Sequence, residues 1–507
     1  MGMAFSLRAQ TARPGAKPDP EQANEHFQHG NYVMALPIYL ALVQKDGDDL
    51  EYNYRTGICY LRTNGHRKEA VKYLETATKN PKCDNDGWLY LGQSYQFALR
   101  FDDAIKAFQT YQLKANKDGK ADAEHYIEQC KNGKVLVANP LDVSFQSIGK
   151  EVNSEYPDYY PFVTEDESML IFTSRRRGNV GAASVEMDGY YASDIYVTKS
   201  VNGVFQKAKG AGALVNGNYD EQCTSLSADG KQMIVYVDNI TSAGDLFLSP
   251  YKNSFGKMEK MHENINSGFE TAGCFSPDGN VFYFASKRDG GQGGTDIYMC
   301  RKLPGNFGWG MASPVPGINT QYNEDFPFMA PDGKTLYFSS QGHNSMGGYD
   351  LFYTVLNEEN NTWSAPRNIG YPVNGPGDDY TISYTANNRV AYITSDREGG
   401  NGDMDIWRIV FNEVQQNSFT VVTGKIQLPD STIDRSDLTI MVTNSATQED
   451  FGTYRPNPNT GRYVIALPPG KYVMTMDVPG CKTYVETLIV FDIGPQGEME
   501  KDIIVTR

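Results

Sequence analysis

Hydrophobic residues recur at helical spacing between about residues 18 and 136, and turns interrupt this pattern about every 34 to 36 residues. The clearest unit combines the large residues Trp88, Leu91 and Phe108 with the small residues Gly92 and Ala104. Small residues let two helices approach closely, while large ones fill the layer between them. The pattern therefore predicts a stack of helix pairs in this part of the chain.

The same unit has the spacing of the tetratricopeptide repeat, and about three units followed by a final helix resemble that family. In arrays of this family the first helix of each pair lines a concave groove that binds a partner. The register of the motif implies a protein-binding groove lined by seven residues: Tyr54, Ile58, Arg62, Leu89, Gln93, Gln96 and Phe97.

A second repeat follows the helical part. Each of its five copies contains a turn, an alternating apolar run and a closing aspartate before two further apolar residues. The closing residues, separated by 51, 51, 54 and 55 positions, are Asp194, Asp245, Asp296, Asp350 and Asp405. A period near 50 residues with several short strands predicts a β-propeller. We expect five blades, and a sixth, degenerate blade stays open because ring closure can borrow the strand around Val143 to Phe145.

The polar positions of this repeat suit tight connections between strands. Asp-Gly or Asn-Asn pairs (Asp229-Gly230, Asp278-Gly279, Asp332-Gly333 and Asn387-Asn388) supply positive φ for hairpins. The closing aspartate is placed to accept backbone N–H groups of the loop before it.

Three arginines, Arg176, Arg288 and Arg397, each follow a serine by two positions, so a ring would place them at equivalent points. Either they share a ligand or each forms a salt bridge with a local aspartate of its own blade, and we favour the second interpretation. The acid-rich segment 399–405 could be taken for a calcium site, but it lacks the ligand spacing of an EF-hand. We expect no metal.

Short alternating strands separated by Pro and Gly turns run from about residue 417 to 507, which predicts a small antiparallel sandwich. The phrase NTGRYVIALPPGKYVMTMDVPGC resembles the regulatory-like domain appended to carboxypeptidases, which implies a transthyretin-like fold. We therefore predict a multidomain protein, α plus all-β, with an N-terminal segment (1–17), a helical array (18–136), a propeller (140–412) and a sandwich (417–507).

Composition excludes some classes of partner. The chain has 46 basic and 62 acidic residues, and its net charge of -16 repels nucleic acid. No window approaches 18 consecutive apolar residues, so we expect no transmembrane segment. The start, MGMAFSLRAQ, resembles the tail of a secretory signal peptide cleaved after Ala9, or is ordinary N-terminal chain; we favour export. The seven cysteines include no CxxC pair, so a structural zinc site is not expected.

Enzyme motifs are missing from the sequence. It contains no GxSxG elbow, no HExxH and no P-loop, and four of its six histidines (His26, His29, His66 and His125) fall in the helical part. We predict that the chain is not an enzyme and uses no cofactor. An unrecognised activity, such as glycan hydrolysis by paired carboxylates, is the alternative.

The order of the parts is itself informative. A helical array, a propeller of the WD-type or TolB-like kind with Arg-x-Gly-Gly and Asp-Ile-Tyr signatures, and a regulatory-like sandwich resemble the PorE-like, OmpA-family envelope proteins of Bacteroidetes. Known members end in a peptidoglycan-binding OmpA-like domain, which this sequence does not show.

Those proteins are associated with the type IX secretion system and gliding machinery. The resemblance implies a periplasmic scaffold, associated with the outer membrane or cell wall, that binds envelope proteins and reaches peptidoglycan at most indirectly. The alternative function is a sensor that binds a glycan or a peptidoglycan fragment.

Overall fold

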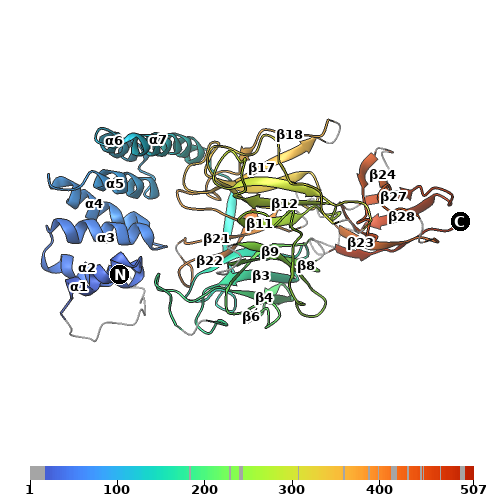
Figure 1. The fold of residues 1–507 in the computed structure, drawn as a ribbon, viewed down its shortest axis with the longest axis horizontal. Helices are drawn as coiled ribbons and strands as arrows, with labels where there is room; N and C mark the ends of the chain where they lie inside the picture. The colour runs from blue at the N-terminus through green and yellow to red at the C-terminus, as the bar shows by residue number, and fades with distance from the viewer. Residues whose placement is uncertain are drawn as a thin grey trace.

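The structure is a computed structural model of the 507-residue chain. It describes residues 17–181, 184–227, 230–238, 244–305, 308–357, 360–385, 389–397, 399–412, 420–430, 433–445, 448, 450–468, 470–490 and 497–507. Figure 1 shows a stack of helices, a central body of β-sheets and a smaller C-terminal body in one row. Residues 1–16, with the predicted cleavage after Ala9, lie outside the described residues, as do the predicted turn residues Asp229, Asn387 and Asn388.

The helical body, drawn from blue to teal in Figure 1, contains seven α-helices and one 3-10 turn in the described residues: α1 (Pro20–Gln28), α2 (Tyr32–Lys45), α3 (Leu50–Arg62), η1 (Arg67–Glu69), α4 (Ala70–Lys79), α5 (Asp86–Phe97), α6 (Phe101–Gln112) and α7 (Lys117–Ala138). Polar caps help to set where helices begin. For example, the Asp49 carboxylate accepts a hydrogen bond from Tyr52 N at 2.8 Å. Each α-helix packs against the next one along the chain.

The close helix approach predicted at Gly92 is present. A Cβ built on Gly92 would overlap the ring of Phe108 on α6, and a Cβ on Gly57 would overlap Leu74 on α4. Both Phe108 and Leu74 are fully buried. Glycine at these two positions therefore lets neighbouring helices approach to within side-chain contact.

Strands β1 to β22 form five sheets in the described residues. Blade 1 contains β2 (Asp158–Val163), β3 (Met169–Ser174), β4 (Asp194–Val201), β5 (Val204–Phe205) and β6 (Lys209–Gly210). Blade 2 contains β7 (Asp220–Leu226), β8 (Gln232–Asp238), β9 (Asp245–Pro250) and β10 (Glu259–Lys260). Blade 3 contains β11 (Glu270–Phe275), β12 (Val281–Ser286), β13 (Asp296–Arg301) and β14 (Ser313–Pro314).

Blade 4 contains β15 (Glu324–Met329), β16 (Thr335–Ser340), β17 (Asp350–Asn357), β18 (Thr362–Trp363) and β19 (Arg367–Asn368). Blade 5 contains β20 (Ile382–Tyr384), β21 (Val390–Ser395), β22 (Asp405–Phe411) and β1 (Val143–Ser147). The first strands of the blades contact one another around the ring, because β2 contacts β7 and β20 while β11 contacts β7 and β15. This arrangement is a β-propeller with the first strand of each blade innermost.

The ring closes through a strand from the start of the propeller. β1 pairs antiparallel with β22, with Val143 opposite Phe411 and Ser147 opposite Trp407. The strand that the sequence offered for ring closure is thus the outer strand of blade 5. No sixth sheet is present in the described residues between β1 and β22.

Glycine turns join the first two strands of blades 3 and 4. Gly279 and Gly333 have φ of +68° each, and each donates its N–H to the carbonyl three residues earlier. Glycine readily adopts positive φ, which explains why it stands second in the two predicted Asp-Gly turns that the structure describes in full.

The C-terminal body has two sheets. One contains β23 (Thr420–Gln427), β26 (Arg462–Leu467), β29 (Gly497–Glu500) and β30 (Ile503–Ile504), and the other contains β24 (Ile440–Asn444), β25 (Asp450–Tyr454), β27 (Gly470–Met476) and β28 (Tyr484–Val490). A common core of buried residues, including Val422, Tyr463 and Met474, lies between them. The sequence predicted an antiparallel sandwich. The structure differs from this prediction, because β23 pairs in parallel with β29 and β30.

Candidate functional site

A cavity of about 140 Å³ lies where the inner strands of the propeller end. All five blades contribute an apolar residue from the end of the inner strand: Val163, Leu226, Phe275, Met329 and Tyr384. Each of these residues stands three positions before the Asp or Asn of its hairpin turn, so the repeat itself builds the ring of side chains. The cavity therefore lies at one mouth of the propeller axis.

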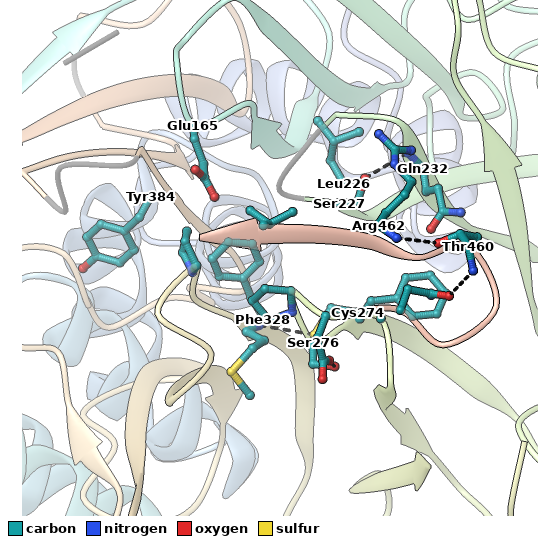
Figure 2. Close-up of a pocket in the computed structure, with 18 of the residues that line it drawn as sticks. Glu165, Leu226, Ser227, Gln232, Cys274, Ser276, Phe328, Tyr384, Thr460 and Arg462 are labelled. Atoms are coloured by element: carbon teal, nitrogen blue, oxygen red, sulfur yellow. Dashed lines mark hydrogen bonds between the residues drawn. The ribbon is translucent and has the colours of Figure 1, made fainter. Parts of the chain in front are cut away.

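The C-terminal body covers this mouth. Asn457, Thr460, Arg462 and Val464, from the turn before β26 and from β26 itself, complete the lining. Asn280 Nδ2 of blade 3 donates to Pro456 O at 3.4 Å, which joins the covering turn to the propeller. In Figure 2 the covering strand β26 runs across the cavity, with Glu165 and Tyr384 toward its end and Arg462, Thr460 and Gln232 toward its start.

Glu165 gives the cavity its buried carboxylate, because only 5% of this residue is exposed. The other lining carboxylate in the described residues, Asp278, accepts hydrogen bonds from Ser276 Oγ at 2.6 Å and from Asn280 N at 3.0 Å. Burial raises the pKa of the Cys274 thiol to about 12, so at neutral pH this thiol is protonated and a weak nucleophile. The lining suits binding of a small ligand with polar and apolar faces.

The sequence did not single out Glu165, although a signal exists. The repeat places Ala228, Pro277, Pro331 and Ala386 at the positions that correspond to Glu165. A carboxylate in blade 1 where the other copies have Ala or Pro is not required by the blade. Comparing the copies position by position would have identified it.

The predicted helical groove is largely closed in the structure. Of its seven residues only Arg62 is exposed. The others are buried or half-buried. Ile58 is 6% exposed within the helical body, and Gln96 is 4% exposed where this body meets the propeller. The remaining four contact other residues of the helical body: Tyr54 contacts Tyr90, Gln93 donates to Tyr126 OH, Leu89 packs beside the Phe101 and Phe108 cluster, and Phe97 lies under the guanidinium of Arg67.

The helical body docks on the opposite face of the propeller from the cavity. Gly65 N donates to the Asp396 carboxylate at 3.0 Å, and Arg67 pairs with the same carboxylate at 3.5 Å. Gln96 Nε2 donates to Met346 O at 2.9 Å. The prediction that Gln96 is open to a partner is therefore wrong, because the propeller of the same chain already occupies this position.

The repeated arginines make contacts within the chain. Arg176 pairs with the buried carboxylate of Asp158, which is a salt bridge to a local aspartate of the kind that the sequence favoured. Arg288 pairs with Glu270 at 3.1 Å, so its partner is a glutamate instead. Each pair joins a loop to the first residue of the inner strand of its own blade.

Arg397 differs from the other two arginines. Its guanidinium lies 3.2 Å above the centroid of the Phe145 ring on β1, and its Nε donates to Ser395 Oγ at 3.0 Å. Burial lowers its pKa to about 10, against the opposing effect of the Asp379 and Asp396 carboxylates. Arg397 thus supports the strand that closes the ring.

The closing aspartates bind the backbone of the loops before them. Carboxylate oxygens of Asp194, Asp296 and Asp350 accept from the amides of Val180 (2.8 Å), Gln292 (2.8 Å) and Met346 (3.0 Å), and Asp405 accepts from Asn401 N. Asp245 pairs with Lys260 at 2.8 Å, and residues 239–243 of its loop lie outside the described residues. Burial raises the pKa of Asp194 and of Asp405 to about 6.

Within the described residues, no group of three or more His, Cys, Asp or Glu side chains is arranged to hold a metal ion. None of the helices in that part of the chain has the length and apolar character that a bilayer crossing requires. All seven cysteines are described and carry free thiols.

No protein-family model and no curated protein matches the chain. Among solved structures, TolB from Acinetobacter baumannii is 15% identical, with 58% of this chain and 71% of that chain covered and a TM-score of 0.34. A glycoside hydrolase is 7% identical, with coverage of 55% and 94% and a TM-score of 0.36. An endo-arabinase from Bacteroides thetaiotaomicron is 13% identical, with coverage of 52% and 97% and a TM-score of 0.34.

These comparisons correct one prediction from the sequence. Two of the three structures named above are enzymes, which contradicts the prediction that the chain is not an enzyme, and we withdraw it. Likenesses of this size do not assign an activity to the chain. No matching family model supports the resemblance to PorE-like envelope proteins.

Proposed function

We propose that the chain is a periplasmic scaffold that binds protein partners of an envelope complex. The observation that carries this proposal is an exposed apolar sheet face on the C-terminal body. Met441, Val485 and Ile489 are 44%, 61% and 50% exposed. Large exposed apolar side chains gathered on one face mark interaction surfaces.

The register of the sheet brings these side chains together. Met441 on β24 lies opposite Thr475 on β27, which lies opposite Val485 on β28, so the three residues form one row. Ile489 stands four residues after Val485 and faces the same side of the sheet. The other face packs into the core through Val442, Met474 and Leu488. The sheet that carries these residues belongs to the C-terminal body, which lies at the end of the molecule away from the helices in Figure 1.

The finer assignment rests on the sequence. The helical body is a tetratricopeptide array (18–136), the propeller spans 140–412, and the C-terminal body is a regulatory-like domain with a transthyretin-like fold (417–507). The order of these modules supports a place among type IX secretion or gliding components near the outer membrane or cell wall. Several rigid surfaces on one chain hold partners at high effective concentration.

Crosslinking of a tagged chain in the intact envelope of its native host, followed by mass spectrometry, tests this function. We expect envelope proteins to be recovered, with crosslinks near the exposed row. The double variant Val485→Lys and Ile489→Lys should lose these partners. Leu113→Lys, which changes an 81% exposed apolar residue of the helical body, is the matched control and should retain them. If the double variant recovers the same proteins, this sheet face is not the surface that binds them.

The cavity favours a second candidate function, binding of a glycan or peptidoglycan fragment. Its volume of about 140 Å³ is close to the roughly 150 Å³ of an engineered cavity that binds benzene, so one sugar-sized ring is the largest unit to consider. Glu165 and Arg462 supply charge-assisted hydrogen bonds, and Phe328 and Tyr384 supply apolar walls.

Thermal unfolding with soluble wall fragments tests the second candidate. A fragment at about 100 times its Kd stabilises the folded state by about 2.7 kcal/mol, which is several degrees in Tm. Glu165→Gln should abolish this shift, while Glu259→Gln on the exposed β10 should preserve it. If the Tm of the wild-type chain does not shift with these fragments, the cavity does not bind them.

A further inference from the structure

The face of the helical body that meets the propeller holds a short segment of the chain as a peptide is held. The segment is residues Ser345–Gly347, in the glycine-rich loop before β17 of blade 4. It lies against α5, which carries the predicted groove residues Gln93, Gln96 and Phe97, and against α7, the final helix after the predicted pairs. Three side-chain amides from these helices reach the segment.

The amides bind backbone groups in sequence along the segment. Asn132 Nδ2 donates to Ser345 O at 3.0 Å, and Gln96 Nε2 donates to Met346 O at 2.9 Å. Gln129 Nε2 donates to Gly347 O and, at 3.3 Å, to Ser345 Oγ. Both glutamines are at least 95% buried. Side-chain amides on consecutive carbonyls fix the backbone of a segment without reading its side chains.

The side chain of Met346 supplies the specific contact. It is fully buried, and it belongs to the apolar cluster of the helical body that includes Phe101, Phe108 and Cys130. Methionine fills irregular apolar space well because its unbranched side chain is flexible and polarisable. The helices thus provide an apolar hole for one methionine, flanked by donors for the backbone on either side.

The blade does not require this methionine. Gln292 in blade 3 and Asn401 in blade 5 occupy the same repeat position, and the amide N–H of each donates to the closing aspartate as that of Met346 does. Gln292 is exposed, which shows that a polar side chain suits the blade at this position. The apolar residue in blade 4 is therefore explained by the helical body and not by the propeller.

We propose that this groove is a binding site for a partner segment that presents a methionine between small residues, and that the propeller loop Ser345–Gly347 blocks it in cis. The proposal rests on the proposed scaffold function and names the class of segment that the helical body recognises. A partner segment can enter only when the loop leaves. Its apparent affinity is therefore the intrinsic affinity multiplied by the fraction of molecules in which the groove is open.

A fluorescein-labelled peptide with the sequence of residues 341–350, QGHNSMGGYD, serves as the probe for fluorescence polarisation with the full chain. We expect Met346→Gln to bind this peptide at least tenfold more tightly than the wild type, because the polar side chain weakens the blocking loop. Gln292→Met, the reverse change at the same repeat position of blade 3, should bind as the wild type does. Adding Gln129→Leu to Met346→Gln should reduce the affinity at least tenfold again.

Equal affinity of wild type and Met346→Gln, or no binding by either, would overturn the proposal. Met346→Ala, which empties the hole by truncation, gives the same test if the glutamine variant does not fold. Envelope crosslinking of Met346→Gln separates the two proposals. If partners are still recovered while the peptide does not bind, the groove assignment is wrong and the scaffold function stands. If the peptide binds and no partner is recovered, the scaffold function is wrong instead.

Discussion

The imidazole of His125 stacks on the phenol ring of Tyr322, with ring centroids 4.0 Å apart and 22° between the ring planes. His125 lies on α7, and Tyr322 lies just before β15, so this pair joins the helical body to blade 4. Burial lowers the pKa of His125, which keeps the ring neutral at pH 7. The contact lies near the amide contacts that α7 makes with the loop Ser345–Gly347.

We expect Tyr322→Ala to loosen the helical body from the propeller. Aromatic pairs contribute about 0.5–1.5 kcal/mol beyond the area that they bury, so the variant should lose at least about 1 kcal/mol of docking free energy. Faster cleavage by a protease between residues 138 and 143 is the measurement. Tyr219→Ala, at a 50% exposed tyrosine between blades 1 and 2, should leave the cleavage rate unchanged.

Gly92→Ala tests the packing of α5 on α6. The added Cβ would overlap the ring of Phe108, so the helices must separate or the ring must move. Overpacking of this kind costs about 1–3 kcal/mol, and we expect Tm to fall by several degrees. Gly47→Ala is the matched control, because a Cβ there meets no atom closer than 3.9 Å. An unchanged Tm for Gly92→Ala would mean that the helices adjust without cost.

The periodic parts of the fold followed from the sequence, and the contacts between them did not. Spacing alone predicted the Asp-Gly turns and the closing aspartates, because these features depend on residues at fixed offsets. The sequence offered the strand around Val143 to Phe145 for ring closure but left open whether it belonged to a sixth blade. The bond from Gln129 to Gly347 joins residues 218 positions apart, and Asn280 reaches Pro456 across 176 positions. No periodicity encodes which surfaces of two folded bodies meet, so the sequence assigned Gln96 to an open groove.

Phe145→Ala tests ring closure. The ring of Phe145 carries the guanidinium of Arg397 at 3.2 Å and belongs to the apolar cluster of blade 5. Phe145 is half-buried, so we expect the variant to lose about 2 kcal/mol, less than the 3–5 kcal/mol of a fully buried phenylalanine. The midpoint of urea unfolding is the measurement. Val204→Ala, at a 64% exposed residue of blade 1, should leave the midpoint unchanged.

Buried carboxylates at the start of the inner strands predict that the propeller is more stable in mild acid. Burial raises the pKa of Glu324 to about 7 from an ordinary 4.5, and it has the same effect on Glu221. Between these two pH values the folded state keeps a proton that the unfolded chain releases. Stability therefore declines as pH rises from about 4.5 to 7, by up to about 1.4 kcal/mol per pH unit for each such group.

Glu324→Gln isolates one of these groups. Thr320 N donates to one carboxylate oxygen at 2.7 Å, and the hydroxyls of Thr320 and Ser340 donate to the other at 2.7 Å each. A glutamine can place its oxygen toward the amide and its NH₂ toward the hydroxyls, which rotate to accept. The variant should therefore fold and show a shallower decline of Tm between pH 5 and 7. Glu263→Gln, at an exposed residue, should keep the wild-type profile, and an identical profile for Glu324→Gln would mean that Glu324 does not carry the proton.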